Sequence, residues 1–216
     1  MTKYKHIIFD LDGTIIESAK GILEAFSIAL EKNSIKPVVK IDSTLIGPPL
    51  KQTISNLIGS QDSVLINKIA DSFKTNYDDS GYKSSVMFDG IYETLDTLSS
   101  SGSILHIATN KRISPTLKIV DHLKIGGFFD SIYALDSFEP VLGTKTQMLG
   151  KVLSQNNILN DEAIYIGDRL DDGYASDENG LDFALAIWGF GPVLDKSKIN
   201  RVWKLLDSPS DILGIK

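Results

Sequence analysis

The segment that decides the fold is His6–Thr14, which reads HIIFDLDGT. Its apolar residues 7–9 have no helical period, so they predict a short buried strand that stops at two carboxylates and a glycine. Ligands bind beyond the carboxyl ends of the strands in an open α/β sheet, which puts Asp10 and Asp12 where a site is expected. An ordinary Asp-Gly turn after a strand is the alternative interpretation of this motif by itself.

The spacing of Asp10 and Asp12 also suits chemistry. Residues two apart project to the same side of an extended backbone, and Gly13 lets the chain turn close to a ligand. One carboxylate could act as a nucleophile while the other handles protons, provided that their surroundings differ.

Composition excludes several classes of protein and site. The chain has 216 residues, of which 42% are hydrophobic, so it can bury a sizeable core. Its net charge of −6 argues against a general binder of nucleic acid or of membrane surfaces, because both are negative. It has no cysteine, which excludes disulfides and thiolate sites, and its three histidines are scattered. The sequence shows no signal peptide or membrane span, so we expect a cytoplasmic protein.

The second half of the chain alternates between strand and helix patterns. The expected strands are 104–108, 132–135, 163–166 and 183–187, and the expected helices are 91–98, 114–123 and 144–155. This alternation predicts an α/β fold, a Rossmann-like parallel sheet with helices on both faces, to which the first strand also belongs. The stretch 201–213 fits either an edge strand with a short helix or two helices.

Residues 18–79 carry a helical pattern instead. Apolar stripes in 22–30, 50–58 and 65–77 predict three or four amphipathic helices. We therefore expect a small α-helical cap, residues 17–82, inserted after the first strand of a core made of residues 1–16 and 83–216. The segment Ile46–Leu50 reads IGPPL. Its spacing favours a simple helix boundary over a close approach of Gly47 to another part of the chain.

Polar residues follow the other expected strands. Thr109 and Asn110 suit phosphate oxygens, and they equally suit turn capping. Asp168 and Asp172, four residues apart, share one face if the chain enters a helix there. Lys145 lies in the first turn of a helix, where the dipole already favours negative charge, so it indicates a bound anion nearby.

Electrostatics predicts a cation among these groups. Two carboxylates about 4 Å apart repel by about 4 kcal/mol at an effective dielectric constant near 20, so Asp10, Asp12, Asp168 and Asp172 cannot all stay ionised unaided. Ligands that are all oxygen indicate a hard ion, and Mg²⁺ fits best because it keeps waters and bridges to phosphate. This ion and Lys145 would together neutralise a phosphoryl group in line with Asp10.

The order of these motifs along the chain resembles that of the haloacid dehalogenase (HAD) superfamily. The helical insertion and the GPPL loop resemble the phosphoglycolate phosphatase-like branch. The resemblance implies that Asp10 is the nucleophile that forms an aspartyl-phosphate, and that Asp12 is the general acid and then the base that activates water. It implies that Thr109 and Lys145 bind the phosphoryl oxygens, although Lys111 competes for the lysine role.

The same resemblance implies a metal site. Its ligands would be the side chains of Asp10 and Asp168, the backbone carbonyl of Asp12, and Asp172 directly or through water. We therefore expect a Mg²⁺-dependent phosphatase that acts on a small phosphomonoester, phosphoglycolate-like by resemblance, as a monomer or homodimer without nucleic-acid or membrane partners. The alternatives are a 5′-nucleotidase, a β-phosphoglucomutase-like phosphomutase and a non-catalytic phosphate-binding regulatory subunit.

Overall fold

The computed structural model describes residues 3–191, 200 and 202–215. A six-stranded sheet, all of whose neighbouring strands pair in parallel, has the order β5-β4-β1-β6-β7-β8. The strands are β1 (His6–Phe9), β4 (Ile104–Thr109), β5 (Phe129–Ala134), β6 (Ala163–Gly167), β7 (Asp182–Ala186) and β8 (Lys204–Leu206). The predicted α/β fold is confirmed, and the C-terminal stretch forms an edge strand followed by the 3-10 helix Pro209–Gly214.

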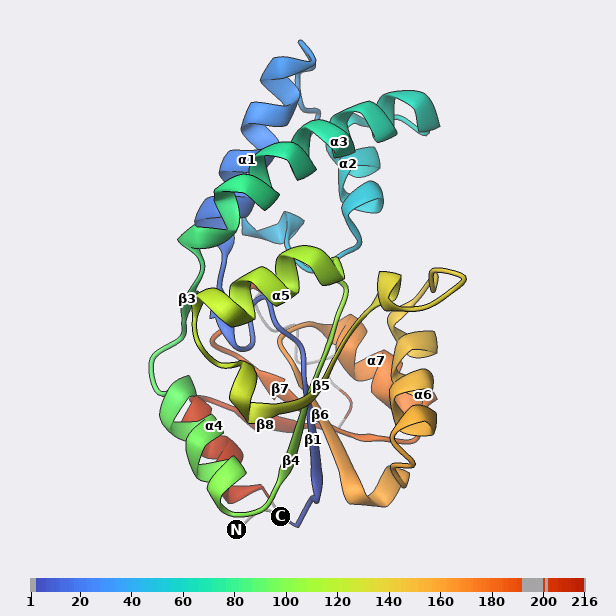
Figure 1. Ribbon diagram of the computed structural model, residues 1–216. Helices are drawn as coiled ribbons and strands as arrows, with labels where there is room; N and C mark the ends of the chain where they lie inside the picture. The colour runs from blue at the N-terminus through green and yellow to red at the C-terminus, as the bar shows by residue number, and fades with distance from the viewer. Residues whose placement is uncertain (1–2, 192–199, 201, 216) are drawn as a thin grey trace.

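Helices cover both faces of this sheet (Figure 1). The alternation of side chains along β1 explains why, since Ile7 and Phe9 belong to one apolar cluster and Ile8 belongs to the other. The first cluster includes residues of α4 (Ile91–Ser100) and α5 (Ile113–His122), and the second includes residues of α6 (Lys145–Gln155) and α7 (Leu170–Glu178). Among the described residues, no helix combines the length and the apolar character needed to cross a membrane.

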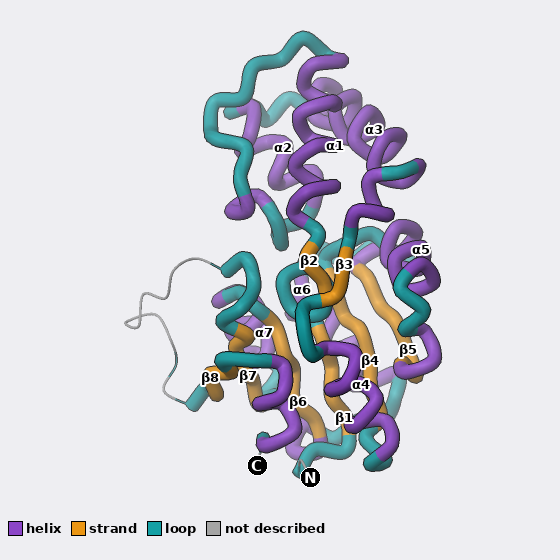
Figure 2. Tube along the Cα trace, turned by 90° about the vertical axis from the view of Figure 1, so that its left-hand side faces the viewer, coloured by secondary structure: helices purple, strands orange, loops and turns teal. Residues whose placement is uncertain are grey.

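Three further helices form a body of their own beyond the carboxyl ends of the strands (Figures 1 and 2). They are α1 (Ala19–Lys32), α2 (Leu50–Ile58) and α3 (Ser63–Asp79), and their apolar stripes pack into a separate cluster. Two short strands, β2 (Ile16–Glu17) and β3 (Val86–Met87), pair antiparallel where the chain leaves and re-enters the core. The sequence missed these strands, because two residues carry no periodic signal. The boundaries 17–82 for a cap domain stay a prediction.

A loop of this helical body reaches the core at Gly47. Asn110 Nδ2 donates to the carbonyl oxygen of Gly47 at 3.0 Å, and Arg169 Nη1 donates to that of Ile46 at 2.8 Å. Gly47 has φ +111°, and a Cβ on it would lie 2.3 Å from Arg169 Cδ. The interpretation of Gly47 as part of a simple helix boundary was therefore wrong, because only glycine combines this backbone angle with so close an approach to Arg169.

Candidate active site

The carboxyl ends of three neighbouring strands bring the predicted residues together. Asp10 follows β1, Thr109 ends β4 and Asp168 follows β6, and β1 pairs with both of the other strands. Lys145 opens α6 directly after Thr144, whose side chain accepts a hydrogen bond from Gln147 N as an N-cap. The parallel sheet thus gathers residues that are far apart in sequence at one edge.

Three carboxylates form a buried cluster at this edge. Asp10, Asp168 and Asp172 each offer one oxygen within 4.8 Å of the others, and they are only 2%, 3% and 1% exposed. Lys145 Nζ lies 3.2 Å from Asp10 Oδ1 and 2.5 Å from Asp172 Oδ1. One ammonium group therefore pairs with two of the three carboxylates, so the cluster has more carboxylates than paired cations.

Burial, together with the neighbouring charges, shifts the pKa values of the cluster. Burial raises the pKa of Asp10 to about 6, with Lys145 opposing the shift and Asp172 adding to it. Burial and the neighbouring carboxylates Asp172 and Asp10 also raise the pKa of Asp168 well above its ordinary value. For Lys145, burial favours the neutral amine, but the charges of Asp10 and Asp172 outweigh it and raise its pKa. A further cation would relieve the repulsion among the carboxylates.

The donor set fits a divalent metal ion. Oδ1 of Asp10 and Oδ1 of Asp168 are buried and accept no hydrogen bond, and Asp10 Oδ1 has only its ion pair with Lys145, so both atoms could serve as metal ligands. Phe190 N donates to Asp168 Oδ2 at 2.7 Å and so orients this carboxylate. Gly13 has φ +85°, and a Cβ there would lie 2.2 Å from Asp168 Oδ2. The turn after Asp12 therefore requires glycine, because a side chain at this position would clash with the Asp168 carboxylate.

Asp12 has different surroundings from Asp10. Its carboxylate lies outside the metal-competent cluster; it accepts a hydrogen bond from Ser18 Oγ at 2.5 Å and pairs with Lys111 Nζ at 2.9 and 3.0 Å. Burial opposes the charge on Lys111, but Asp12 and then Tyr77 raise its pKa above the ordinary value. The structure thus gives each candidate lysine a place, Lys145 beside Asp10 and Lys111 beside Asp12. The backbone carbonyl of Asp12 stays a predicted metal ligand.

Thr109 and Asn110 differ in where their side chains point. Thr109 is 1% exposed at the end of β4, and its hydroxyl accepts a hydrogen bond from Lys111 N at 3.3 Å. Asn110 directs its amide to Gly47 of the helical body, as described above. Its predicted role in phosphate binding stays a prediction.

A cavity of about 70 Å³ adjoins Asp12 between the core and the helical body. Its core side includes Asn110, Lys111 and Arg112. Its other side is mainly apolar and includes Ile22, Phe26, Leu45, Leu50 and Phe73. Sequence reasoning missed the contributions of Ser18, Tyr77 and Arg112, because no motif marks them and only tertiary packing brings them to the site.

Comparisons with known proteins show the family to which the chain is similar. A family model described as "Haloacid dehalogenase-like hydrolase" matches residues 7–186. A protein named Tyrosine-protein kinase PtkA from Mycobacterium tuberculosis is 30% identical over 214 residues, covering 97% of this chain and 72% of that protein. A phosphoglycolate phosphatase from Aquifex aeolicus is 30% identical over 188 residues, covering 85% of each chain. The crystal structure of a predicted phosphatase from Clostridium acetobutylicum matches with a TM-score of 0.86 at 29% identity, covering 98% of this chain and 99% of that chain.

The family model covers most of the chain, and its match spans β1 through β7. Phosphatases among the relatives and the solved structures support the predicted enzyme class, a HAD-type phosphatase. The resemblance drawn from the motif order is confirmed at this level: the chain belongs to the haloacid dehalogenase-like hydrolase family.

Proposed function

We propose that this protein is a Mg²⁺-dependent phosphatase that hydrolyses a small phosphomonoester through an aspartyl-phosphate on Asp10. One observation carries the proposal: two carboxylates two residues apart have contrasting partners. Asp10 lies in the acidic cluster beside Lys145, whereas Asp12 is held by Ser18 and Lys111. Such a division suits one nucleophile and one proton-transfer group.

The first step transfers the phosphoryl group to Asp10. Asp12 enters this step protonated. A carboxylate oxygen of Asp10 attacks the phosphorus, the bond from phosphorus to the ester oxygen breaks, and Asp12 gives its proton to the departing alcohol. Lys111 then stabilises the carboxylate that Asp12 has become. Lys145 and Thr109 bind the phosphoryl oxygens.

The second step hydrolyses the aspartyl-phosphate. Asp12 takes a proton from a water molecule, the water oxygen attacks the phosphorus, and the bond from phosphorus to Asp10 breaks. Inorganic phosphate leaves, and both aspartates return to their starting states. The cavity beside Asp12 gives the leaving alcohol and the incoming water a place next to the proton-transfer group.

The metal would be held by the side chains of Asp10, Asp168 and Asp172 and by the backbone carbonyl of Asp12. When bound, it supplies positive charge that stabilises the phosphoryl oxygens and keeps Asp10 ionised. Binding has a readout that does not depend on turnover. Mg²⁺ should raise the Tm of the wild type but not that of Asp168→Asn, with Asp96→Asn, an exposed aspartate on α4, as the matched control.

Phosphate release from a substrate panel tests the function. The panel contains phosphoglycolate, sugar phosphates, nucleoside monophosphates and ATP, the last because the Mycobacterium tuberculosis relative is named a kinase. We expect release that needs Mg²⁺, stops with a chelator and is lost in Asp10→Asn but kept in Asp96→Asn. Turnover in Asp10→Asn at the wild-type rate would overturn the nucleophile, and no turnover of any ester would favour a phosphate-binding subunit.

The panel also separates the enzyme alternatives. A 5′-nucleotidase would prefer the nucleoside monophosphates to the other esters. A phosphomutase would convert a sugar phosphate to its isomer with little release of phosphate.

A further inference from the structure

The helical body presents an apolar wall to the cavity beside Asp12. Ile22 and Phe26 on α1 and Phe73 on α3 line it, together with Leu45 and Leu50. A leaving group that enters this cavity exchanges water for apolar side chains. This favours an apolar group, because each buried CH₂ contributes about 0.8 kcal/mol.

Two cationic residues line the same cavity, and the structure engages both of them elsewhere. Lys111 contacts both carboxylate oxygens of Asp12 and lies over the ring of Tyr77 at 4.7 Å. Arg112 forms a two-pronged pair with Asp78 of α3, with Nη1 donating to Oδ2 at 2.8 Å and Nη2 donating to Oδ1 at 2.5 Å. Among the described residues that line the cavity, no cation is left over for a second anionic group of the substrate.

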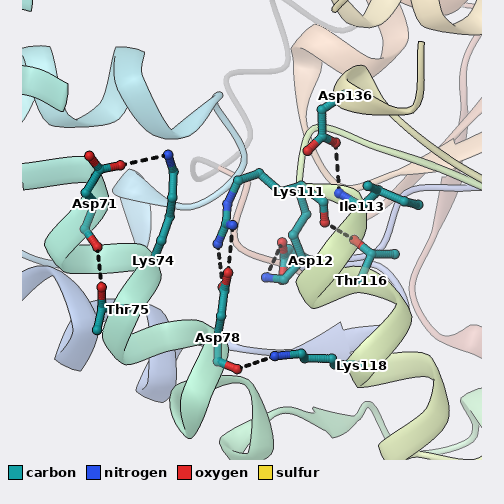
Figure 3. A network of polar contacts seen from close by, with 11 residues as sticks. Asp12, Asp71, Lys74, Thr75, Asp78, Lys111, Ile113, Thr116, Lys118 and Asp136 are labelled. Carbon is teal, nitrogen blue, oxygen red and sulfur yellow. Dashed lines mark hydrogen bonds and ion pairs between the residues drawn. The ribbon is translucent and has the colours of Figure 1, made fainter.

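The Arg112–Asp78 pair has further support from α5. Figure 3 shows Asp78 facing Lys118, whose Nζ donates to the backbone oxygen of Asp78 at 2.6 Å. Both side chains of the ion pair are less than one-quarter exposed, so bulk water screens them only in part. Asp78 therefore holds Arg112 in an ion pair with α3, so the positive charge of Arg112 is already matched where it lines the cavity.

We propose that the site selects phosphomonoesters whose leaving group is uncharged and apolar, and that Asp78 sets this selectivity by holding Arg112 in an ion pair. This inference rests on the proposed phosphatase function. A carboxylate on the leaving group would lose water in this cavity, lie near Asp12 and find no free cation. Burying an unpaired charge in this way is strongly unfavourable. The proposal disfavours phosphoglycolate, which carries such a carboxylate.

Propyl phosphate and phosphoglycolate provide a matched pair of substrates, because they have about the same size and only one bears the extra carboxylate. We expect the wild type with Mg²⁺ to show kcat/KM for propyl phosphate that is at least about tenfold higher. In Asp78→Ala, Arg112 becomes free to pair with the carboxylate. The kcat/KM for phosphoglycolate relative to propyl phosphate should then rise about tenfold or more.

Two variants control for a general effect of the substitution. Asp71→Ala changes another aspartate of α3, whose partner is the neighbouring Lys74, and should leave the substrate ratio at its wild-type value. Asp78→Ala/Arg112→Gln removes the freed cation, so the gain for phosphoglycolate should disappear. The Tm of each variant reports whether it folds. If Asp78→Ala does not fold, the ratio of kcat/KM values measured for the wild type still tests the proposed selectivity.

The possible outcomes separate this proposal from the phosphatase function. Preference of the wild type for phosphoglycolate would overturn the proposed selectivity and leave the phosphatase intact. An unchanged ratio in folded Asp78→Ala would overturn the role of Asp78. Failure to hydrolyse either ester, together with the rest of the panel, would overturn the phosphatase itself.

Discussion

The two ends of strand β1 both bury polar side chains, but they satisfy them differently. At the amino end, His6 Nδ1 lies 3.0 Å from His106 Nε2, and His106 Nδ1 lies 2.7 Å from Ser131 Oγ. At the carboxyl end, Asp10 Oδ1 and Asp168 Oδ1 accept no hydrogen bond. Both ring nitrogens of His106 thus have partners within the protein, whereas the carboxylates are left with ligand-binding capacity.

This difference separates a structural group from a reactive one. Buried polar groups are normally hydrogen-bonded, and the histidine pair meets this requirement within the protein. The two carboxylate oxygens at the opposite end accept no hydrogen bond, and only Asp10 Oδ1 has an ion pair, with Lys145. Burying such oxygens is costly unless a cation binds them. Substitutions at the carboxyl end should therefore change chemistry, and substitutions at the amino end should change only stability.

The largest expected effect distinguishes the roles of Asp10 and Asp12, both of which follow the carboxyl end of β1. Asp10→Asn should reduce turnover by at least about a thousandfold and form no phosphoenzyme, because the nucleophile is gone. Asp12→Asn should slow turnover by about 10²–10⁴-fold, the usual contribution of general acid–base catalysis. Of the two variants, only Asp12→Asn should show the aspartyl-phosphate when the reaction is quenched with acid and analysed by mass spectrometry. A phosphorylated Asp10→Asn would show that another residue is the nucleophile.

Lys145 provides the second test, through stability rather than turnover. Lys145→Met leaves the buried carboxylates of Asp10 and Asp172 without their ammonium partner, so the free energy of unfolding at pH 7 without metal should fall by about 3–5 kcal/mol. Mg²⁺ should restore part of this loss, because it can replace the missing positive charge. Urea denaturation with and without Mg²⁺ measures both effects. Lys151→Met, an exposed lysine on the same helix, should lose little stability, and equal losses in the two variants would contradict the charge argument.

The histidine pair predicts a pH effect from the amino end. Burial lowers the pKa of His106 to about 4 and also lowers the pKa of His6. Unfolded histidines titrate near 6.5, so between pH 6.5 and pH 4 the unfolded chain binds more protons at these two residues, and their contribution to stability is lost as the pH falls. The two histidines should contribute a loss of about 1–3 kcal/mol. The raised pKa of Asp10, about 6, acts in the opposite direction, because there the folded chain binds the proton first.

His106→Phe isolates this effect. As the pH falls from 6.5 to 4, its unfolding free energy should fall less, or rise more, than that of the wild type, while kcat/KM at pH 7 stays the same. The difference between the two pH profiles cancels the contribution of the carboxylates. Parallel profiles would mean that the histidine pair does not resist protonation.

The same contrast explains how much the sequence revealed. Apolar runs that end in polar residues predicted the parallel sheet and the strand ends at which Asp10, Thr109 and Asp168 lie. This worked because burial leaves a periodic signal and a parallel sheet collects strand ends at one edge. Lys145 was predicted from its unfavourable place in a helix dipole, and the structure puts it against Asp10.

Contacts between the core and the helical body could not be predicted in this way. The Arg112–Asp78 pair, the hydrogen bond from Ser18 to Asp12 and the β2–β3 pairing depend on how two separately packed bodies meet. No local sequence pattern distinguishes the residues that supply these contacts from solvated ones. Asn110 is an example: its place after β4 suggested a phosphate ligand, which stays a prediction, whereas its contact with Gly47 was not predicted.

The smallest expected effect decides what Asn110 does. If its main role is to hold the loop at Gly47, Asn110→Ala removes one hydrogen bond worth about 1 kcal/mol and should raise KM several-fold with little change in kcat. Asn67→Ala, an exposed asparagine on α3, is the control and should change neither parameter. A fall in kcat of about a hundredfold at unchanged KM would instead place the Asn110 amide on the phosphoryl group in the transition state. Asn110 would then contribute to the reactive end of the sheet rather than to the contact between core and helical body.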